Sequence, residues 1–547
     1  MEAAIAGYIF AGLAAPKESK RWEAAHVVRG ICTLAHKRVL AELIGLTKTN
    51  SGGPFVDARL YFYNLHAREW LLIALARAAK GTQSILLSHA DFLKQYAVGG
   101  ELHVLIRQFA ARALLAILDS GLFPEAADLR DGLERVNVSP LPPIESKSYE
   151  RLKKRQSKDK EPEESDDDRL YFGIDIGPYW FEPLGRHFAK SEAEIEREAR
   201  QIIRGEFHYS GSSRWDADER ARRRIFRDQE TYHSHSSYPR VDNLHFYHAY
   251  HAMMMVAGKL LSSVPEHREP GEEGDSFRDW LSRHDISRPD GNWLADRRDP
   301  TPLEWPEWKG DKEPEHWRWS LWKDDFDHAL AFGQERVNLW GHWTMISGGR
   351  KETISIDSAL VSRDRSESLL RALQTASNPH DYRIPDAGDE LEIDHGGFQL
   401  KGWIAHEDHL GSGIDEQDPW SGGISYPPTR PAQFVIDLMD LNSDSERRVW
   451  YSMNRASTSP VLWSQVWGHY SEKDDSDEKE SGRRIQASPQ FIADFLRKVE
   501  MDLIVEVEMD RRYAHSRYES HKDESVGFIP PSARLFLIKS NGQIFTI

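Results

Sequence analysis

The stretch Arg21-Trp22-Glu23-Ala24-Ala25-His26 decides the fold of the amino-terminal part of this chain. It places an arginine three and four positions before two small residues, and Arg68 and Arg107 likewise precede small or apolar residues. The recurrences are 47 residues (21 to 68) and 39 residues (68 to 107) apart. Helical pairs of the HEAT and armadillo type repeat at about 40 to 47 residues and stack into α-solenoids. Residues 1–140 are therefore predicted to form HEAT-like helical repeats.

Composition and charge divide the rest of the chain into three further regions. Residues 141–169 open with Pro142-Pro143 and continue through a basic run into an acidic one, which predicts a charged flexible linker. Nine of the 18 tryptophans lie between positions 280 and 343, and residues 170–345 are predicted to be a Trp/His-rich, mainly helical region. Residues 346–547 are predicted to be a mixed α+β region with a terminal hairpin.

Local patterns predict the elements within these regions. An apolar stretch at 3–15 indicates a helix packed against the next one, and capping signals predict helices at 191–204, 242–262 and 488–499. The triplet Ser540-Asn541-Gly542 is typical of the turn of a short hairpin. Runs of strand-forming residues predict strands at 353–360, 397–405, 432–441, 448–453, 501–509, 534–539 and 543–547. The fold class is thus multidomain, α plus α/β.

Bulk composition excludes several classes of protein. Hydrophobic residues make up 39% of the chain, which is too many for a disordered protein. A net charge of −17 makes nucleic acid an unlikely partner, because phosphate binding needs a basic surface. The apolar stretch at 3–15 is too short to cross a membrane. Cys32, the single cysteine, allows no internal disulfide, so we expect a buried thiol in a cytoplasmic protein.

A group of histidines in the middle region is the first candidate for chemistry. Neutral imidazoles bind zinc and similar ions, and three of them converging would leave one coordination position open. On a helix, the last three of the group lie three residues apart along one side. The alternative is that Tyr247, Tyr250, Met254, Ala257 and Leu261 form the buried stripe of that helix and the histidines only flank it. The candidate metal ligands are His233, His235, His245, His248 and His251.

Four acids of the carboxy-terminal region are a second candidate. Asp502, Glu506, Glu508 and Asp510 alternate with apolar residues and so share one face of a predicted strand. Carboxylates grouped in this way can hold Mg²⁺ for phosphodiester chemistry, although a solvated strand face gives the same pattern. Aromatic side chains offer a third candidate, a surface that stacks on a sugar or a base, against the alternative of core packing. That surface would comprise His316, Trp317, Trp319 and Trp322.

The segment at residues 21–26 and the arginine pattern at Arg107 resemble the HEAT-type repeats of large bacterial NACHT/STAND-type NTPases. Those proteins join an effector, an NTPase module and a helical sensor, and many act in anti-phage defence or signalling. The resemblance covers about 120 of the 547 residues, and the NTPase module is missing. It implies that this chain corresponds to the sensor or carboxy-terminal portion of such a protein.

Two functions follow from these observations. The first is a cytoplasmic recognition or scaffold component that binds a protein partner and no cofactor, and that would be the sensor part of a bacterial defence or signalling system. The second is a metal-dependent hydrolase or nuclease effector, which would use the histidines of the middle region or the strand acids with a divalent metal. Convergence of these residues in one cleft would favour the second function.

Overall fold

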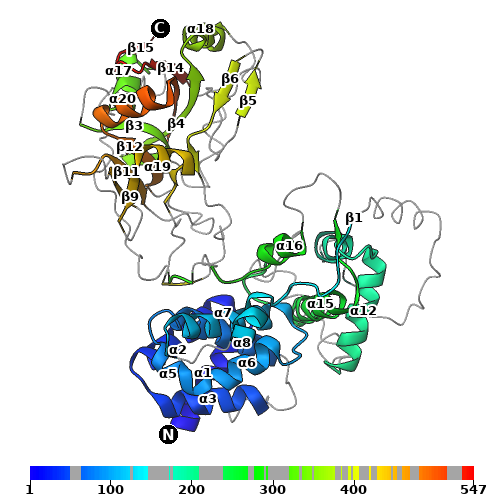
Figure 1. Cartoon of the computed structure of the whole chain (residues 1–547). Coiled ribbons are helices and arrows are strands. Elements are labelled where there is room, and N and C mark those ends of the chain that lie inside the picture. Colours follow the sequence, from blue (N-terminus) through cyan, green and yellow to red (C-terminus); the bar gives the residue numbers. More distant parts are fainter. Residues whose placement is uncertain are drawn as a thin grey trace, which may run out of the picture. The chain divides into compact units, whose positions relative to one another are not determined.

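Two compact units make up the chain (Figure 1). The first comprises Met1–Trp293 with Gly413–Pro419, and the second comprises Leu294–Ser412 with Trp420–Ile547. The computed structural model describes residues 1–49, 63–122, 127–145, 172, 176–208, 238–268, 276–288, 291–293, 320–331, 335–347, 350–375, 384, 392–395, 398–405, 418–420, 428–444, 448–452, 459–467, 480–513 and 532–546.

The division between the units does not follow the predicted boundaries at residues 140 and 345. The amino-terminal helices and the helical part of the middle region share one hydrophobic core, so they belong to the same unit. Most of the predicted linker, residues 146–169, lies outside the described residues. Its first residues form β1 (Ile144–Glu145), which pairs in parallel with β2 (His267–Arg268).

The first unit is built from helices, as the sequence predicts for its amino-terminal part. Among the helices described there, none is long and apolar enough to cross a membrane. Cys32 is buried, and burial raises the pKa of its thiol to about 11. The helices are α1 (Glu2–Leu13), α2 (Glu18–Thr33), α3 (Lys37–Thr49), α4 (Asn64–Ala78), α5 (Gln83–Leu86), α6 (Ala90–Val98), α7 (Val104–Asp119), α8 (Ala127–Glu134), η3 (Gly177–Phe181), α11 (Glu182–Arg186), α12 (Glu192–Gly205), α15 (Leu244–Ser263) and α16 (Phe277–Arg283).

Three predicted helices of this unit are confirmed. The apolar stretch at 3–15 forms α1, which packs against α2 and α3. The capping signal before residue 192 is a complete capping box, in which Ser191 and Glu194 bond each other's backbone amides at the start of α12. The helix predicted at 242–262 is α15, capped by Asn243.

Helix α15 is the central helix of the first unit. Residues 246–254 are all buried, and the helix packs against α7 and α12. The stripe that the sequence indicates is buried, but the alternative that His248 and His251 only flank it is wrong, because both are buried themselves. The physical reason is visible in its composition: Lys259 is the one charged residue of α15, and a helix that is apolar around its whole circumference is buried on all sides.

The second unit is a large, mostly antiparallel sheet with helices on both faces. The strand order is β15-β14-β13-β4-β3-β12-β11-β10-β9, with β6 beside β4 and β5 beside β6. The strands are β3 (Val337–Ser347), β4 (Arg350–Ser362), β5 (Glu392–His395), β6 (Phe398–Lys401), β9 (Leu441–Ser443), β10 (Val449–Ser452), β11 (Leu462–Trp467), β12 (Ser481–Ala487), β13 (Met501–Tyr513), β14 (Ser532–Ile538) and β15 (Ile544–Thr546). A separate pair is β7 (Ile404–Ala405) with β8 (Arg430–Pro431).

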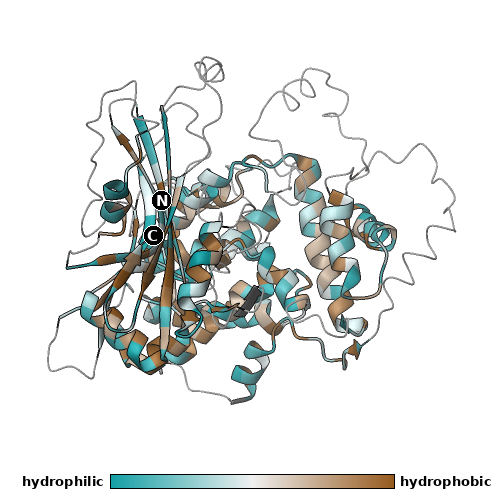
Figure 2. Cartoon of the chain, turned by 90° about the horizontal axis from the view of Figure 1, so that it is seen from above, coloured by the Kyte–Doolittle hydropathy of each residue, from teal (hydrophilic) through white to brown (hydrophobic). Residues whose placement is uncertain are grey.

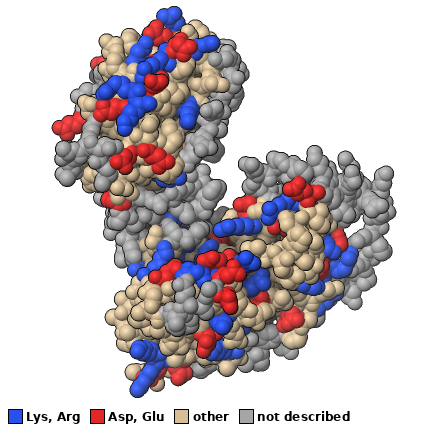
Figure 3. All heavy atoms as spheres, viewed as in Figure 1, with Lys and Arg blue, Asp and Glu red and all other residues tan. Residues whose placement is uncertain are grey.

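Hydrophobic and hydrophilic residues alternate along the strands of this sheet (Figure 2). The larger core lies on one face under α17 (Lys323–Ala329), α19 (Gln433–Met439) and α20 (Pro489–Val499). A smaller core on the other face includes Leu369 and Leu370 of α18 (Ser366–Thr375). On the faces visible in Figure 3, basic and acidic side chains are interspersed over each unit.

Most elements predicted in the last region are confirmed, and two predictions are wrong. The helix at 488–499 is α20, and the terminal hairpin is β14–β15 with Gly542 at a φ of 82° in its turn. The segment 432–441 contains α19 instead of a strand, because Val435 and Met439 lie four residues apart and are buried together. Residues 337–347, assigned to the mainly helical region, form the central strand β3, whose Trp340 and Trp343 fill the core.

Candidate functional site: a buried histidine–carboxylate network

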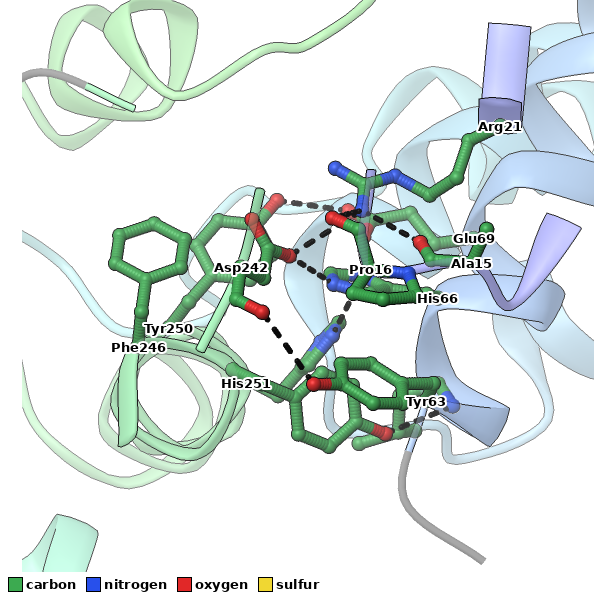
Figure 4. A network of polar contacts seen from close by, with 12 residues as sticks. Ala15, Pro16, Arg21, Tyr63, His66, Glu69, Asp242, Phe246, Tyr250 and His251 are labelled. Carbon is green, nitrogen blue, oxygen red and sulfur yellow. Dashed lines mark hydrogen bonds and ion pairs between the residues drawn. The ribbon is translucent and has the colours of Figure 1, made fainter. Parts of the chain in front are cut away.

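The described residues of the first unit contain a network of buried polar side chains from five segments (Figure 4). Arg21 comes from α2, His66 and Glu69 from α4, His103 from the amino-terminal cap of α7, and Tyr250 and His251 from α15. Asp242 lies two residues before the start of α15. All seven are buried, so each polar atom must find its partner inside the protein.

A chain of hydrogen bonds connects three histidines. His66 Nε2 bonds Asp242 Oδ2, His66 Nδ1 lies 3.0 Å from His251 Nε2, and His251 Nδ1 lies 2.9 Å from His103 Nε2. At the far end, the backbone N–H of Ile106 donates to His103 Nδ1 at 3.3 Å. The chain thus runs from an aspartate before α15 to the first turn of α7.

The partners at the two ends of this hydrogen-bond chain fix which nitrogen of each imidazole carries the proton. The Ile106 N–H can only donate, so His103 Nδ1 accepts and its proton is on Nε2. The same logic puts the proton of His251 on Nε2, where it is donated to His66. His66 then carries its proton on Nε2 and donates it to the Asp242 carboxylate. All three imidazoles are neutral, and both ends require the same direction of donation.

Burial supports the neutral state of these rings. Desolvation, with Arg21 nearby, lowers the pKa of His66 to about 4 although Asp242 opposes the shift. Desolvation and the charge of Arg68 lower the pKa of His103 to about 3. The pKa of His251 is lowered well below its ordinary value, first by burial and then by the neighbouring histidines. The three histidines of the hydrogen-bond chain are therefore uncharged at neutral pH.

Arg21 supplies the positive charge that balances Asp242. Its Nη1 lies 3.3 Å from Asp242 Oδ2, and it donates to the carbonyl oxygens of Ala15 at 2.8 Å and Pro16 at 2.9 Å. The backbone N–H of Asp242 donates in turn to the Pro16 oxygen at 2.9 Å. The α1–α2 turn is thereby tied to the segment that leads into α15.

Two members of the network have a buried atom without a hydrogen-bond partner among the described residues, Arg21 at Nε and Glu69 at Oε2. Tyr250 donates its hydroxyl to Glu69 Oε1 at 2.9 Å, whereas the buried Oε2 has no hydrogen-bond partner. Burial raises the pKa of Glu69 to about 8, so its carboxyl is mostly protonated at neutral pH. Burying a neutral carboxyl without a hydrogen-bond partner costs less free energy than burying a carboxylate without one. The fold can therefore accommodate Oε2 of Glu69 without a partner.

The same residues are a possible set of metal ligands. One ligand atom each from His66, Glu69 and His251 lie within 4.8 Å of one another. Two histidines and a carboxylate form the donor set of many zinc and iron enzymes. Asp242 would serve as the outer carboxylate that orients a histidine ligand through its second nitrogen.

The hydrogen-bond chain competes with such a metal. His251 would have to present a lone pair at Nε2, so its proton would move to Nδ1 and be donated to His103. His103 would then carry its own proton on Nδ1, facing the N–H of Ile106. Metal binding therefore requires the loss of the cap of α7, in addition to the loss of the proton on the Glu69 carboxyl.

Access to the network is narrow. The cavity beside Arg21, His66 and Asp242 has a volume of about 20 Å³, which is room for about one water molecule. His251 and Glu69 have no exposed surface. A substrate larger than water cannot reach these side chains in this conformation.

The structure separates the histidines that the sequence groups together. Of the three on α15, His251 alone belongs to the network. His248 stacks on Phe207 with ring centroids 5.6 Å apart, and His245 lies 5.2 Å from the ring of Phe172. The predicted ligands His233 and His235 lie outside the described residues.

The four strand acids share a face of β13 as predicted, but they do not form one group. Asp502 is buried, and it accepts hydrogen bonds from Ser366 Oγ at 2.8 Å and from the N–H of Ser540 at 3.2 Å. It holds α18 and the hairpin turn against the sheet. Burial, followed by the charge of the next acid along the strand, raises the pKa of Glu506 and that of Glu508.

The aromatic surface is described only at Trp322. This side chain is 64% exposed, and its backbone N–H donates to Asp325 at 2.7 Å where α17 begins. His316, Trp317 and Trp319 lie outside the described residues, so the predicted stacking surface remains a prediction.

Sequence reasoning missed most of the network. His66 and Glu69 lie three apart on a largely buried helix, and a polar pair at that spacing is the signal that could have identified them. The recurrent pattern indicates that Arg21 is the first residue of a repeat. It does not reveal that Arg21 pairs with Asp242, 221 residues later. No protein-family model and no curated protein matches this chain, so the network is interpreted from its own geometry.

Proposed function

We propose that the chain is a protein-recognition or scaffold component and that the outer face of α1 contacts its partner. The observation that carries the proposal is a stripe of exposed apolar residues on α1: Met1, Ala4, Ile5 and Tyr8. Tyr8 is 71% exposed although the opposite side of the same helix is buried in the core. Enclosure of the polar network supports a role in binding rather than in catalysis.

The spacing of this stripe indicates what kind of partner fits it. Positions 1, 4, 5 and 8 follow the i, i+3, i+4, i+7 pattern by which one helix packs on another. No side chain of the stripe is charged, so its complement is an apolar one. The partner is therefore an amphipathic helix of another protein, laid along α1.

The coarser features of the first unit agree with a recognition module of stacked helices. Successive helices α1 to α4 and α6 to α8 pack on their neighbours in the chain. We propose that they form a HEAT-like α-solenoid and that the chain corresponds to the sensor part of a bacterial defence or signalling system. A cytoplasmic location and a protein partner rather than nucleic acid are parts of the same proposal.

A photo-crosslinking amino acid at position 8, compared with one at Leu122, tests the contact surface. Leu122 is a matched control because it is an apolar residue of the same unit that is 51% exposed. One dominant product at position 8, absent at position 122, is expected. The protein in that product is then purified and its affinity measured for the wild type, Tyr8→Asp and Leu122→Asp.

The affinity should fall at least tenfold for Tyr8→Asp and stay unchanged for Leu122→Asp. A charge placed in an apolar helix interface is left without a partner, which is the physical reason for the loss. Equal affinities for the two variants, or the same crosslinked products from both positions, would overturn the proposal.

The donor set of His66, Glu69 and His251 favours a second candidate, a metal-dependent hydrolase. This function requires an opening of the first unit that admits substrate, together with the proton rearrangement of His251 and His103. Metal-dependent hydrolysis of a general esterase or phosphodiesterase substrate, lost in His66→Asn and kept in His248→Asn, would support it. His248 is the matched control because it is buried on α15 outside the ligand set.

A further inference from the structure

Arg107 differs from the other two arginines of the recurrent pattern. Arg21 is balanced by Asp242, and Arg68 lies 3.5 Å from Glu101 Oε2. The side chain of Arg107, on α7, makes no hydrogen bond or ion pair with any residue in the described ranges, and its Nε and Nη2 are shielded from solvent. A guanidinium is charged at all physiological pH values, and this half-buried one has no ion-pair partner within the described residues.

The guanidinium lines a cavity of about 250 Å³ within the first unit. The apolar wall includes Val98 at the end of α6, Val138, and Leu261 near the end of α15. Arg135 also lines the cavity, and its Nε lies 3.0 Å from Asp131 Oδ1 one helical turn earlier. The cavity thus combines an uncompensated positive charge with an apolar surface.

The acidic side chains near Arg107 form ion pairs with other arginines. Glu101 acts on Arg107 through its charge, but it pairs with Arg68, and its Oε1 accepts a hydrogen bond from the backbone N–H of His103 at 3.1 Å. Asp131 pairs with Arg135. Burial lowers the pKa of Arg107, and the charge of Glu101 opposes this shift without reversing it.

We propose that this cavity binds a small organic carboxylate with an aliphatic body. The planar carboxylate would face Arg107, whose fork of N–H donors matches its two oxygens. The aliphatic part would cover Val98, Val138 and Leu261. A doubly charged phosphate fits less well, because an apolar wall and a single uncompensated guanidinium cannot satisfy a second negative charge.

A homologous series of straight-chain carboxylates tests the proposal by titration calorimetry on the full chain. Acetate, butyrate and hexanoate are the probes, and inorganic phosphate is the comparison. Each methylene that enters the apolar part of the cavity should tighten binding roughly fourfold. Hexanoate should therefore bind much more tightly than acetate, and phosphate more weakly than hexanoate.

Two variants separate the charge from the cavity. Arg107→Leu should weaken hexanoate at least tenfold, since it removes the charge-assisted hydrogen bonds. Val98→Phe fills part of the cavity and keeps the charge, and it should also weaken hexanoate. Arg130→Gln is the control, because Arg130 lies on α8 and pairs with Asp119 away from the cavity.

Three results would overturn the inference. The first is that the wild-type chain binds none of the carboxylates. The second is that the affinity does not depend on chain length or that phosphate equals hexanoate. The third is that Arg107→Leu and Val98→Phe bind hexanoate as tightly as Arg130→Gln does.

Discussion

His251 lies 185 residues after His66 in the sequence, and its Nε2 donates a hydrogen bond to His66 Nδ1 over 3.0 Å. This contact joins α15 to α4 at the centre of the first unit. With Asp242 and His103 it forms a directed chain of neutral imidazoles that is satisfied at both ends. The contact explains why the helical part of the middle region and the amino-terminal helices form one unit.

Asp242→Asn should destabilise the first unit by about 3 kcal/mol, because it leaves Arg21 buried without a counter-charge. Urea unfolding followed by tryptophan fluorescence gives the free energy of unfolding. Asp119→Asn, which breaks the exposed pair with Arg130, should change it by less than about 0.5 kcal/mol. A similar loss of unfolding free energy in Asp242→Asn and Asp119→Asn would show that the buried pair of Arg21 with Asp242 stabilises the unit no more than an exposed pair does.

The stability of the first unit should be greatest near pH 6.5. The folded pKa of His66, about 4, and that of His103, about 3, lie below the unfolded value of 6.5. The unfolded chain therefore binds more protons than the folded chain below pH 6.5, and stability falls as the pH drops from 6.5 towards 4.

Glu69 acts in the opposite direction. Its folded pKa of about 8 exceeds the unfolded 4.5, so its stabilising effect is lost as the pH rises towards 8.

Glu69→Gln isolates the alkaline part of this profile. Between pH 6.5 and pH 8 the wild type should lose about 2 kcal/mol more than the variant, at about 1.4 kcal/mol per pH unit for one proton. Urea midpoints across this pH range measure the difference. Exposed His36 provides the control, since His36→Asn should leave the profile as in the wild type. If the unfolding free energy of the wild type and of Glu69→Gln changed with pH in the same way, the conclusion that Glu69 is protonated at neutral pH would be contradicted.

Gly258→Ala should destabilise the first unit although alanine is the better helix former. A Cβ at this position of α15 would lie 1.9 Å from the carbonyl oxygen of Leu102, directly before the cap of α7. We expect a loss of about 2 kcal/mol from the forced shift. Gly45→Ala in α3 meets no atom within 4 Å and should instead gain up to about 1 kcal/mol. Thermal melts of the two variants measure these opposite signs, and a gain for both would disprove the close approach.

Arg511→Met should destabilise the second unit by about 3 to 5 kcal/mol. Arg511 Nε lies 2.5 Å from Glu352 Oε2 and its Nη2 lies 3.3 Å from Asp325 Oδ1, so the variant leaves two acids facing each other. Arg512→Met, on the exposed side of the same strand, should cost less than about 0.5 kcal/mol. Urea midpoints for the second unit measure both, and equal losses would contradict the account.

The sequence predicted those elements whose signals are local. The capping box at Ser191, the hairpin at 540–542 and the helix at 488–499 depend on residues a few positions apart. The polar network could not be predicted in the same way. Asp242 and His66 are 176 positions apart, and nothing in the local pattern of either reveals the other. The same limit applies to one edge of β3, whose pairing with β12 connects residues more than 130 positions apart, whereas its pairing with β4 begins at Ser347 and Arg350 and is local.

The domain boundaries show a similar limit. Composition changes near residue 140, yet α15 is so apolar that it is buried against α7 and α12, which places the two regions in one core. Burial on all sides requires neighbours, and the sequence does not say which helices provide them. The sequence could not separate His245 and His248 from His251 for the same reason, since the rings of His245 and His248 lie against the aromatic neighbours Phe172 and Phe207.

Elemental analysis of the purified chain by inductively coupled plasma mass spectrometry, with His66→Asn and His248→Asn beside it, tests the central claim most directly. The claim is that the buried network is a closed hydrogen-bonded centre and that the chain works by recognition. It predicts no stoichiometric transition metal in any of the three proteins. One zinc, iron or manganese per chain in the wild type and in His248→Asn, and none in His66→Asn, would contradict it and favour the metal-dependent enzyme.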